Sequence, residues 1–173
     1  MTKPSFSAIV DRELATLYRV ARRLARRAED AEDLVGTTLL LAAKAWERFD
    51  GAYPRSWLIR IMRNEYYHQY GKQKAAPMMV TEGFAEPSEE GFWQAIDWKL
   101  VGSEITAAID ALPDDFRMAL VLCDVEEMSY QEVADALDVP IGTVRSRLFR
   151  ARRLLRASLV NLGMNEQEEA NHD

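Results

Sequence analysis

A chain of 173 residues, with 48% hydrophobic and 29% charged residues, has a globular composition and is long enough for one medium domain or two small ones. Its single cysteine, Cys123, excludes a disulfide framework and a cysteine-based metal cluster, and we expect it to be a buried, inert thiol. The net charge of −6 would disfavour nucleic acid if the charge were spread evenly, but it is clustered along the chain.

The sequence lacks the motifs of several functional classes. There is no glycine-rich phosphate loop, His-Glu-x-x-His motif, nucleophile elbow or metal-ligand spacing, so we expect no enzyme activity, no metal and no cofactor. No apolar run approaches the ~20 residues that span a bilayer, and no signal-like segment opens the chain. We therefore expect a cytoplasmic protein without membrane contact.

The first two predicted helices cover residues 5–28 and 31–49. In the first, apolar residues recur at spacings of three and four, surrounded by arginines. This apolar set is Leu14, Leu17, Val20, Ala21 and Leu24. We expect Asp30 to cap the second helix. The residues that the second helix buries are Leu34, Val35, Leu41, Ala42, Ala45, Trp46 and Phe49.

The outer face of the second helix combines an acid, small polar residues and a leucine. At about 100° per residue, one sector of about 100° contains Asp33, Gly36, Thr37, Leu40 and Lys44. A single exposed leucine is ordinary on a protein surface, but this combination of residues also suits a partner protein.

A turn at residues 50–54 precedes a third helix, for which Ser56 is the expected cap. The helix directs inward Trp57, Leu58, Ile61 and Met62. Its outward residues, which lead to Lys72 and Lys74, are Arg60, Arg63, Asn64, Tyr66, Tyr67 and His68. Aromatic rings interleaved with cations suit single-stranded nucleic acid, because bases stack on rings while cations hold phosphates. The tyrosines fit core packing equally well.

Residues 75–97 differ in composition from the segments on either side. They contain prolines, glycines and five acids but no lysine or arginine, which is typical of a linker. Two further helical segments, 100–112 and 113–125, follow it. After Leu162 the chain becomes an acidic tail that we expect to be disordered.

Residues 128–155 are predicted to form a helix-turn-helix. Ser129 and Glu132 make a capping box that opens the first helix. The buried residues of that helix are Val133, Ala134 and Leu137. Pro140 supplies a fixed φ for the start of the second helix, and we expect Gly142 to keep the turn uncrowded.

The second helix of this unit has an apolar stripe and a basic remainder. The stripe, roughly 80° wide, consists of Ile141, Val144, Leu148, Ala151 and Leu155. The remainder is expected to face out and holds Thr143, Arg145, Ser146, Arg147, Phe149, Arg150, Arg152, Arg153 and Arg156. No acid occurs in residues 143–157, whereas residues 110–138 carry nine acids and one base. An ordinary solvated face mixes its signs, so this face is predicted to lie against a polyanion.

The order of these segments resembles the extracytoplasmic-function (ECF) sigma factors, small two-domain members of the sigma-70 family, over nearly the full chain. Residues 30–35 (DAEDLV), followed by Ala45-Trp46, look like the helix that such proteins lay on the clamp helices of RNA polymerase. Residues 56–64 (SWLIRIMRN) are similar to the segment that binds the −10 element. The domain that reads the −35 element is matched by residues 112–117, 129–134 and 141–152.

This resemblance implies an all-α protein of two small helical domains joined by a flexible linker, the second being a helix-turn-helix domain. The implied divisions are 1–75 for polymerase and the −10 element, 76–98 for the linker, 99–163 for the −35 element and 164–173 for the tail. The implied function is that of an alternative sigma factor that binds core RNA polymerase and promoter DNA and directs promoter-specific transcription initiation. An anti-sigma factor is the expected regulator, and we expect a monomer when the protein is free.

The resemblance also implies roles for individual residues. At the −35 element it implies Arg145, Ser146, Phe149 and Arg150, and the same predicted face adds Thr143 and Arg147. At the −10 element it implies base capture by Asn64 with the 48–55 loop, which includes Tyr53, and phosphate contacts from Arg60, Arg63 and Lys72. At the polymerase it implies Asp30, Asp33, Thr37 and Leu40. Gly36-Thr37 stand where the family usually has Gln-Glu, which removes polar contacts and adds a helix-weakening glycine.

Two other functions fit parts of the pattern. A helix-turn-helix regulator that binds operators would explain the arginine-rich helix, but it would leave the first 75 residues without a role and usually needs a dimer. A sigma-like decoy that binds an anti-sigma protein is the second alternative. Its expected mark is a loss of DNA-facing residues, whereas the 145–150 face is intact.

Overall fold

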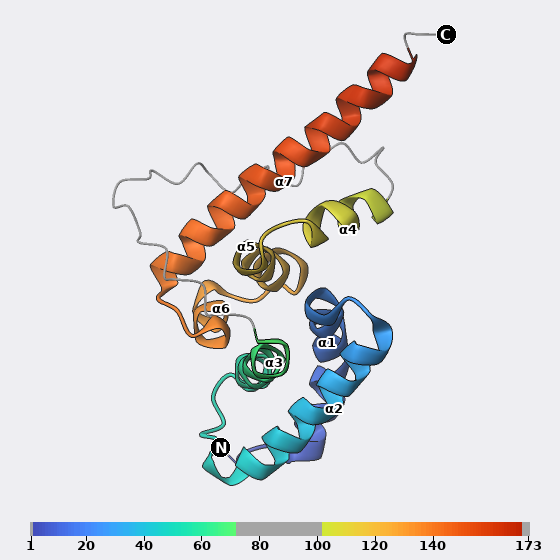
Figure 1. Cartoon of the computed structure of the whole chain (residues 1–173). Coiled ribbons are helices and arrows are strands. Elements are labelled where there is room, and N and C mark those ends of the chain that lie inside the picture. Colours follow the sequence, from blue (N-terminus) through green and yellow to red (C-terminus); the bar gives the residue numbers. More distant parts are fainter. Residues whose placement is uncertain (1, 72–101, 171–173) are drawn as a thin grey trace.

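The computed structural model describes residues 2–71 and 102–170, with side chains given up to residue 161 (Figure 1). All regular structure within these residues is helical, which confirms the expected all-α fold. The elements are α1 (Phe6–Ala25), α2 (Ala28–Ala45), η1 (Trp46–Arg48), α3 (Pro54–Tyr70), α4 (Gly102–Asp110), α5 (Asp114–Leu120), η2 (Val121–Val125), α6 (Tyr130–Leu137) and α7 (Ile141–Ala170). The expected linker at 76–98 lies outside the described residues.

The first three helices form the N-terminal domain, in which α1, α2 and α3 pack against one another. Ser5 caps α1, because its Oγ accepts a hydrogen bond from the Ala8 backbone N–H at 3.2 Å. Four of the five residues expected on the apolar face of α1 are buried, and Leu14 is the exception with 44% of its surface exposed. The buried face runs instead through Glu13 and Thr16.

The second helix begins and ends earlier than the sequence suggests. Because α2 begins at Ala28, Asp30 lies inside its first turn and is not its N-cap; there the acid still interacts favourably with the helix dipole. The helix ends at Ala45, and the last expected turn is the short 3₁₀ helix η1. Leu41, which we expected in the core, is 37% exposed, whereas Ala42 is completely buried.

The third helix begins before the expected cap. Pro54 occupies its first position, where the fixed φ of proline suits a helix start, and the preceding Tyr53 adopts the left-handed conformation with φ 49°. Ser56 is therefore not an N-cap. Its Oγ donates instead to the backbone carbonyl of Glu132 on α6, at 2.9 Å.

The capping box expected at the start of α6 is confirmed. The Ser129 Oγ accepts from the Glu132 N–H at 3.2 Å, and the Glu132 carboxylate accepts from the Ser129 N–H at 2.8 Å. Asp138 ends the helix in the left-handed conformation, with φ 54°, and α7 begins at Ile141. Since α6 and α7 pack against each other across this short turn, the helix-turn-helix is confirmed.

The long helix α7 is buried along most of its predicted stripe. Its completely buried residues are Val144, Leu148, Ala151 and Leu155. Ile141, the first helical residue, is 37% exposed, and Gly142 relieves no crowding, since a Cβ there would meet no atom within 4 Å. The helix continues to Ala170, so residues 164–170 are helical and not the disordered segment that we expected. Glutamate, glutamine and alanine are good helix formers and extend a helix that has already formed.

The two domains pack against each other along α3 and α6 (Figure 1). One apolar core cluster contains residues from both, including Ile59 and Met62 of α3 and Val133 and Leu137 of α6. A second cluster lies within the C-terminal domain, where α4 and α5 pack against α7. The described residues of the two domains therefore form one packed body.

Candidate nucleic-acid interface

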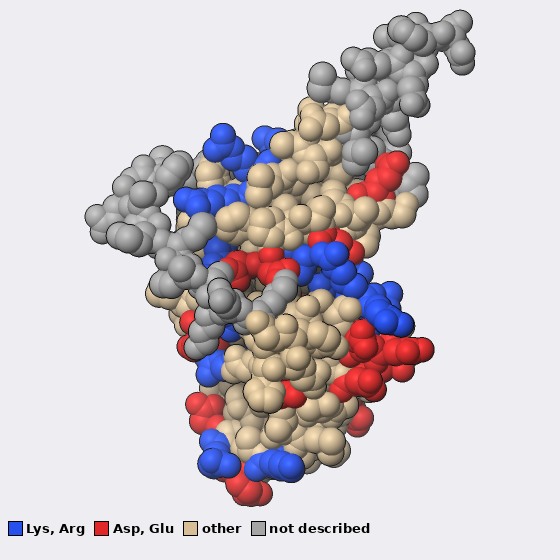
Figure 2. Space-filling model, in the orientation of Figure 1, with Lys and Arg blue, Asp and Glu red and all other residues tan. Residues whose placement is uncertain are grey.

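The outward side of α7 presents basic, polar and aromatic side chains together. The α7 face, as we define it, spans about 140° of the helix and consists of Arg145, Ser146, Phe149 and Arg150. Arg145 is exposed, and its Cζ lies 5.7 Å from the ring centroid of Tyr130 on α6, a cation–π distance. The other three side chains are half-buried. Lysine and arginine atoms gather over the left part of α7 in Figure 2. Such a surface can place guanidinium groups against phosphates or base edges.

Thr143 and Arg147, which we expected to face outward on α7, point inward. Their exposed fractions are 6% and 5%, and Arg147 Nη2 lies 3.9 Å from Asp115 Oδ2 on α5. The two residues are one helical turn apart beside the apolar stripe, on a side of α7 that α5 covers. The buried side of α7 is thus wider than its apolar residues alone, and neither residue belongs to the α7 face.

Other arginines of the C-terminal domain are matched to acids within the domain. Arg152 donates to both carboxylate oxygens of Asp124, at 3.0 and 2.7 Å, and only 14% of its side chain is exposed. Arg117, whose side chain is 3% exposed, donates to Asp114 at 2.6 Å. Burial is the main reason that the pKa of Arg117 is lowered. These pairs fix α5 and η2, so the charge clusters seen in the sequence partly neutralise each other inside the fold.

The outer side of α2 is open to a partner. The α2 face consists of the four residues expected there, Asp30, Asp33, Thr37 and Leu40. Asp33 is exposed, Leu40 is 67% exposed, and the other two are half-buried. A Cβ at Gly36 would meet no atom within 4 Å, so no close approach in the described part of the chain requires this glycine. Acidic side chains gather near the start of α2 in Figure 2.

The loop between α2 and α3 is held by stacked aromatic rings and by a lysine that sequence reasoning missed. Phe49 and Trp57 stack with ring centroids 4.3 Å apart and planes at 19°. Lys3 Nζ donates to the carbonyl oxygens of Trp46 and Phe49, at 2.5 and 2.8 Å, and lies 4.1 Å from the Trp46 ring centroid. No pattern in the sequence marks a lone lysine near the start of the chain for this role.

Glu13 fixes the other end of this loop and was also missed. It is 4% exposed and accepts hydrogen bonds from Arg55 Nε at 2.6 Å and from Arg12 Nε at 3.0 Å. Arg55 is the second residue of α3, so the bond ties α1 to the start of α3. The sequence position of Glu13 could have indicated this role. Glu13 lies between Ile9 and Leu17 on the buried face of α1, where an unpaired acid is costly.

The side chains expected at the −10 element differ in exposure. Asn64 is exposed, and Tyr53 is 51% exposed at the end of the loop. Arg63 is half-buried, with its Cζ 5.1 Å from the ring centroid of Tyr67. Lys72 lies outside the described residues. The loop and the outer side of α3 therefore offer an exposed amide, an exposed ring and a half-buried guanidinium.

The tyrosines at the end of α3 pack on one another. The ring centroid of Tyr66 is 5.7 Å from that of Tyr67 and 4.8 Å from that of Tyr70. Burial is the main reason that the pKa of Tyr66 is raised. Tyr70, by contrast, is 49% exposed. Tyr66 thus serves packing, while the ring of Tyr70 is open enough for a base to stack on it.

Arg60, expected to face outward, is bound by the other domain. Its Nε donates to the backbone carbonyl of Asp135 at 2.9 Å, and its Nη2 donates to the Asp135 carboxylate. Ser56, one turn earlier on α3, is completely buried where it donates to the Glu132 carbonyl. We call Ser56 and Arg60 the α3 edge. Periodicity within α3 cannot show this contact, because α6 supplies all its acceptors.

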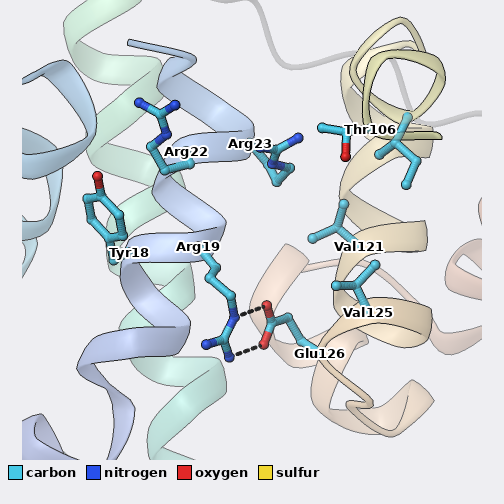
Figure 3. Close-up of a pocket in the computed structure, with 9 residues that line it drawn as sticks. Tyr18, Arg19, Arg22, Arg23, Thr106, Val121, Val125 and Glu126 are labelled. Atoms are coloured by element: carbon cyan, nitrogen blue, oxygen red, sulfur yellow. Dashed lines mark hydrogen bonds and ion pairs between the residues drawn. The ribbon is translucent and has the colours of Figure 1, made fainter. Parts of the chain in front are cut away.

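A second contact between the domains crosses a cleft between α1 and the α4–η2 side of the C-terminal domain (Figure 3). Arg19 donates through Nε and Nη2 to the two carboxylate oxygens of Glu126, each at 2.8 Å, and these bonds raise the pKa of Arg19. Arg23 donates to Asp110 at 2.7 Å. The cleft has a volume of ≈ 330 Å³ and is further lined by Tyr18, Arg22, Thr106, Ile109, Val121 and Val125.

A metal site and a membrane-spanning helix are both absent from the described residues. Nowhere in residues 2–71 and 102–170 do three or more His, Cys, Asp or Glu side chains come together as they would around a metal ion. None of the described helices is both long and apolar enough to cross a membrane. Cys123, expected to be buried, is half-buried and packs against both core clusters.

Both halves of the chain match known protein families. Residues 9–76 match the family model described as Sigma-70 region 2, and residues 103–155 match the model described as Sigma-70, region 4. The first range contains the α2 face, the loop and the α3 edge. The second contains the α7 face.

Curated relatives cover most of the chain. SigE of Mycolicibacterium smegmatis, an ECF RNA polymerase sigma factor, is 35% identical over 88% of this chain, and the match spans 61% of SigE, less than two thirds of its length. EcfG of Rhodopseudomonas palustris, also an ECF RNA polymerase sigma factor, is 33% identical over 83% of this chain and 79% of EcfG. SigW of Bacillus subtilis is 29% identical over 91% of this chain and 90% of SigW.

Solved structures show the same fold across both domains. The sigma factor RpoE of Bartonella quintana, in complex with the anti-sigma factor NepR, has a TM-score of 0.67 and 28% identity over 89% of this chain and 96% of RpoE. CnrH, in complex with the cytosolic domain of CnrY, has a TM-score of 0.65 and 26% identity over 90% of this chain and 88% of CnrH. The chain belongs to the ECF RNA polymerase sigma factors, within the sigma-70 family.

Proposed function

We propose that this protein is an alternative sigma factor that binds core RNA polymerase and directs initiation at promoters with particular −10 and −35 elements. The observation that carries the proposal is the α7 face, with Arg145 exposed and three half-buried residues beside it, on the second helix of a capped helix-turn-helix. Binding and geometry perform this function, and no covalent step is assigned to the chain.

At the −35 element, we infer that the start of α7 enters the major groove. Arg145 and Arg150 are five residues apart, about 7.5 Å along the helix, which corresponds to about two base-pair steps. Each guanidinium can donate two hydrogen bonds to a guanine or to phosphate oxygens, and Phe149 can pack against a thymine methyl group. Phosphate contacts supply salt-dependent affinity, while base contacts, on the order of 1–3 kcal/mol each, set promoter choice.

At the −10 element, we infer that the loop before α3 receives an unstacked base of the non-template strand. Lys3, Glu13 and the Phe49–Trp57 stack hold this loop in place before DNA arrives. A preformed loop loses less conformational entropy on binding, which offsets part of the few kcal/mol that unstacking a base costs. Tyr53 and Asn64 are the exposed side chains available to contact the strand.

At the polymerase, we infer that the α2 face contacts the clamp helices. Leu40 supplies an exposed apolar contact, and Asp33 an exposed acid about two turns before it. An apolar centre with charged residues at its edge is the usual composition of a transient protein interface. Gly36, beside Thr37, adds no side chain to this side of the helix between Asp33 and Leu40.

Regulation and location follow from the same assignment. We infer that an anti-sigma factor binds this protein, since the similar sigma factor RpoE of Bartonella quintana was solved in complex with the anti-sigma factor NepR. We place the protein in the cytoplasm, where core polymerase and promoter DNA are found. We also propose that it is a monomer when no partner is bound.

The proposal is tested by in vitro transcription with purified core polymerase, pooled genomic promoter fragments and this protein as the sole sigma factor. RNA start sites that share sequence elements about 10 and 35 base pairs upstream are the expected result, because two separated DNA-binding surfaces impose two elements. Core polymerase alone is the control for unspecific starts. No new start sites with a folded protein and active polymerase would overturn the proposal in favour of an operator-binding regulator or a decoy.

A further inference from the structure

We propose that residues 2–5 belong to the surface that reads the −10 element, with Lys3 as the positioning residue of the loop before α3. Lys3 holds this loop, residues 46–53, in one conformation, and that conformation determines which base of the −10 element fits. The inference rests on the proposed function, in which the loop receives an unstacked base. It adds a segment that lies more than 40 residues before the loop in the sequence.

Lys3 binds the loop through two backbone carbonyl groups where α2 and η1 end. Its Nζ donates to the carbonyl oxygen of Trp46 at 2.5 Å and to that of Phe49 at 2.8 Å. The Trp46 oxygen also accepts from the Phe49 N–H at 3.2 Å, which closes η1. Carbonyl groups at the end of a helix carry its negative partial charge, so an ammonium group is favourable there. Lys3 therefore fixes the direction in which the chain leaves η1.

The side chain of Lys3 is itself held in place. Its Nζ lies 4.1 Å from the ring centroid of Trp46, a cation–π distance. The ring centroid of Phe6, the first residue of α1, lies 5.3 Å from that of Trp46, and Ser5 caps α1. The segment that leads into α1 thus passes the end of α2 on a fixed path (Figure 1). A side chain whose own conformation is fixed by packing can hold a neighbouring loop to a narrow range of positions.

The rest of the loop contains two positions with a left-handed backbone. Gly51 has a φ of 88° and Tyr53 a φ of 49°, and a tyrosine keeps this conformation only where its surroundings enforce it. Asp50 Oδ1 accepts from the Ala52 N–H at 2.8 Å, which closes the turn. The stem of Lys3 lies against this turn, since a Cβ at Gly51 would be 3.8 Å from Lys3 Cγ. The loop held in this way presents the ring of Tyr53, which is 51% exposed.

Loss of the Lys3 contacts should affect the choice of base more than DNA binding as such. A loop with one conformation favours the base that fits it, whereas a loop with several conformations gives each base some fit. The best-fitting base therefore loses most when the loop is released. The α7 face belongs to the other domain, so we expect selection at the −35 element to be independent of Lys3.

The test measures the −10 and −35 preferences separately in three full-length variants. Lys3→Met keeps the apolar stem but removes the ammonium group, and Lys3→Arg restores a cationic donor. Arg27→Met, the control, removes one positive charge from an exposed site at the start of α2. Each protein initiates transcription with core polymerase from a promoter found by start-site mapping, in which one element at a time is randomised.

We expect Lys3→Met to lower the preference for bases in the −10 element about fivefold, in line with the loss of hydrogen bonds at a partly exposed site. Its −35 preference should equal that of the wild type. Lys3→Arg should retain most of the −10 preference, because the guanidinium can donate to the same carbonyl oxygens. Arg27→Met should match the wild type at both elements.

Amide hydrogen exchange, measured by mass spectrometry, follows the loop without DNA or polymerase. The N–H groups of Phe49 and Ala52 are hydrogen-bonded within the loop, so we expect peptides covering residues 46–53 to exchange faster in Lys3→Met than in the wild type. Peptides covering residues 144–151 of α7 should exchange as in the wild type. This comparison separates a local effect on the loop from a general loss of stability.

Three results would overturn the inference. An unchanged −10 preference in Lys3→Met would show that Lys3 does not determine selection, and an equal loss at both elements would show a general loss of stability. A lower −10 preference without faster exchange would mean that Lys3 acts on DNA directly and not through the loop. Failure of the wild type to produce start sites would instead overturn the proposed function, and hydrogen exchange would still decide whether Lys3 holds the loop.

Discussion

The α7 face and the α3 edge both carry arginines expected at promoter DNA, but the fold treats them in opposite ways. Arg145 is exposed and rests on the ring of Tyr130 within its own helix-turn-helix. Arg60 is bound by Asp135 of the other domain. The difference arises because α3 packs against α1, α2 and α6 and its Arg60 lies where α6 covers it, whereas Arg145 lies at the exposed start of α7, beside α6. The face proposed for the −35 element is thus accessible in the packed protein, whereas Arg60, proposed for the −10 element, is covered by α6.

The largest expected effect comes from removing a buried side chain of α7 that supports the α7 face. Leu148 is completely buried in the C-terminal core, so Leu148→Ala should lower the free energy of unfolding by about 2–5 kcal/mol. Leu154→Ala, on the same helix but 42% exposed, is the control and should change it by less than about 0.5 kcal/mol. Urea unfolding followed by circular dichroism measures both. Equal losses for the two variants would contradict the burial of this side of α7.

The next largest effect is expected when a side chain of the α7 face itself is removed. Arg145→Ala should weaken −35-dependent initiation by roughly tenfold, because one arginine contact to DNA is worth on the order of 1–3 kcal/mol. It should also relax the preference for bases in the −35 element. The measurement is in vitro transcription from promoters with single substitutions in that element.

Arg27→Ala is the charge-matched control for this experiment, since Arg27 is exposed at the start of α2. It should leave promoter preference unchanged. Unchanged −35 preference in Arg145→Ala would show that the α7 face does not read the promoter.

Local features of this chain follow from the sequence because they depend on neighbours a few residues away. The Ser129–Glu132 capping box and the buried Val144 and Leu148 are fixed by spacing within one helix or one turn. Similarly, the outward position of Asp33 and Leu40 on α2 follows from helical periodicity. These predictions were confirmed for that reason.

Features that depend on a second element could not be predicted in this way. Arg147 is polar and sits among outward residues in the sequence, but α5 covers it and Asp115 lies beside it. Ser56 has the residue type of an N-cap, but Pro54 starts the helix earlier and α6 supplies a different partner. Long-range acceptors override local propensity at both positions. The same holds for Lys3, whose partners are more than 40 residues away.

A smaller effect is expected where the N-terminal domain positions its loop. Glu13→Gln keeps the shape of the side chain but removes the charge that holds Arg55, whose side chain is 33% exposed. We expect −10 opening to fall about fivefold, equivalent to roughly 1 kcal/mol for a partly exposed pair, with −35 selection unchanged. Permanganate reactivity of unpaired thymines measures opening. Glu47→Gln, an exposed acid in the adjoining η1, is the control, and an equal loss there would contradict a special role for Glu13.

The smallest effect concerns Gly36, which borders the α2 face on the exposed side of the helix. A Cβ at Gly36 would meet no atom within 4 Å, so Gly36→Ala should stabilise α2 by about 0.5–1 kcal/mol through the lower backbone entropy of the unfolded chain. Gly51→Ala is the control, with an effect of opposite sign expected. Because Gly51 has a φ of +88°, an alanine there should be destabilising by about 1–2 kcal/mol. Thermal unfolding resolves both signs, and a titration with core polymerase shows whether the added methyl group on the α2 face alters binding. Stabilisation without loss of polymerase affinity would mean that Gly36 weakens the helix without serving the contact. A loss of affinity would mean that the polymerase approaches α2 closely at Gly36, where the glycine leaves room for it.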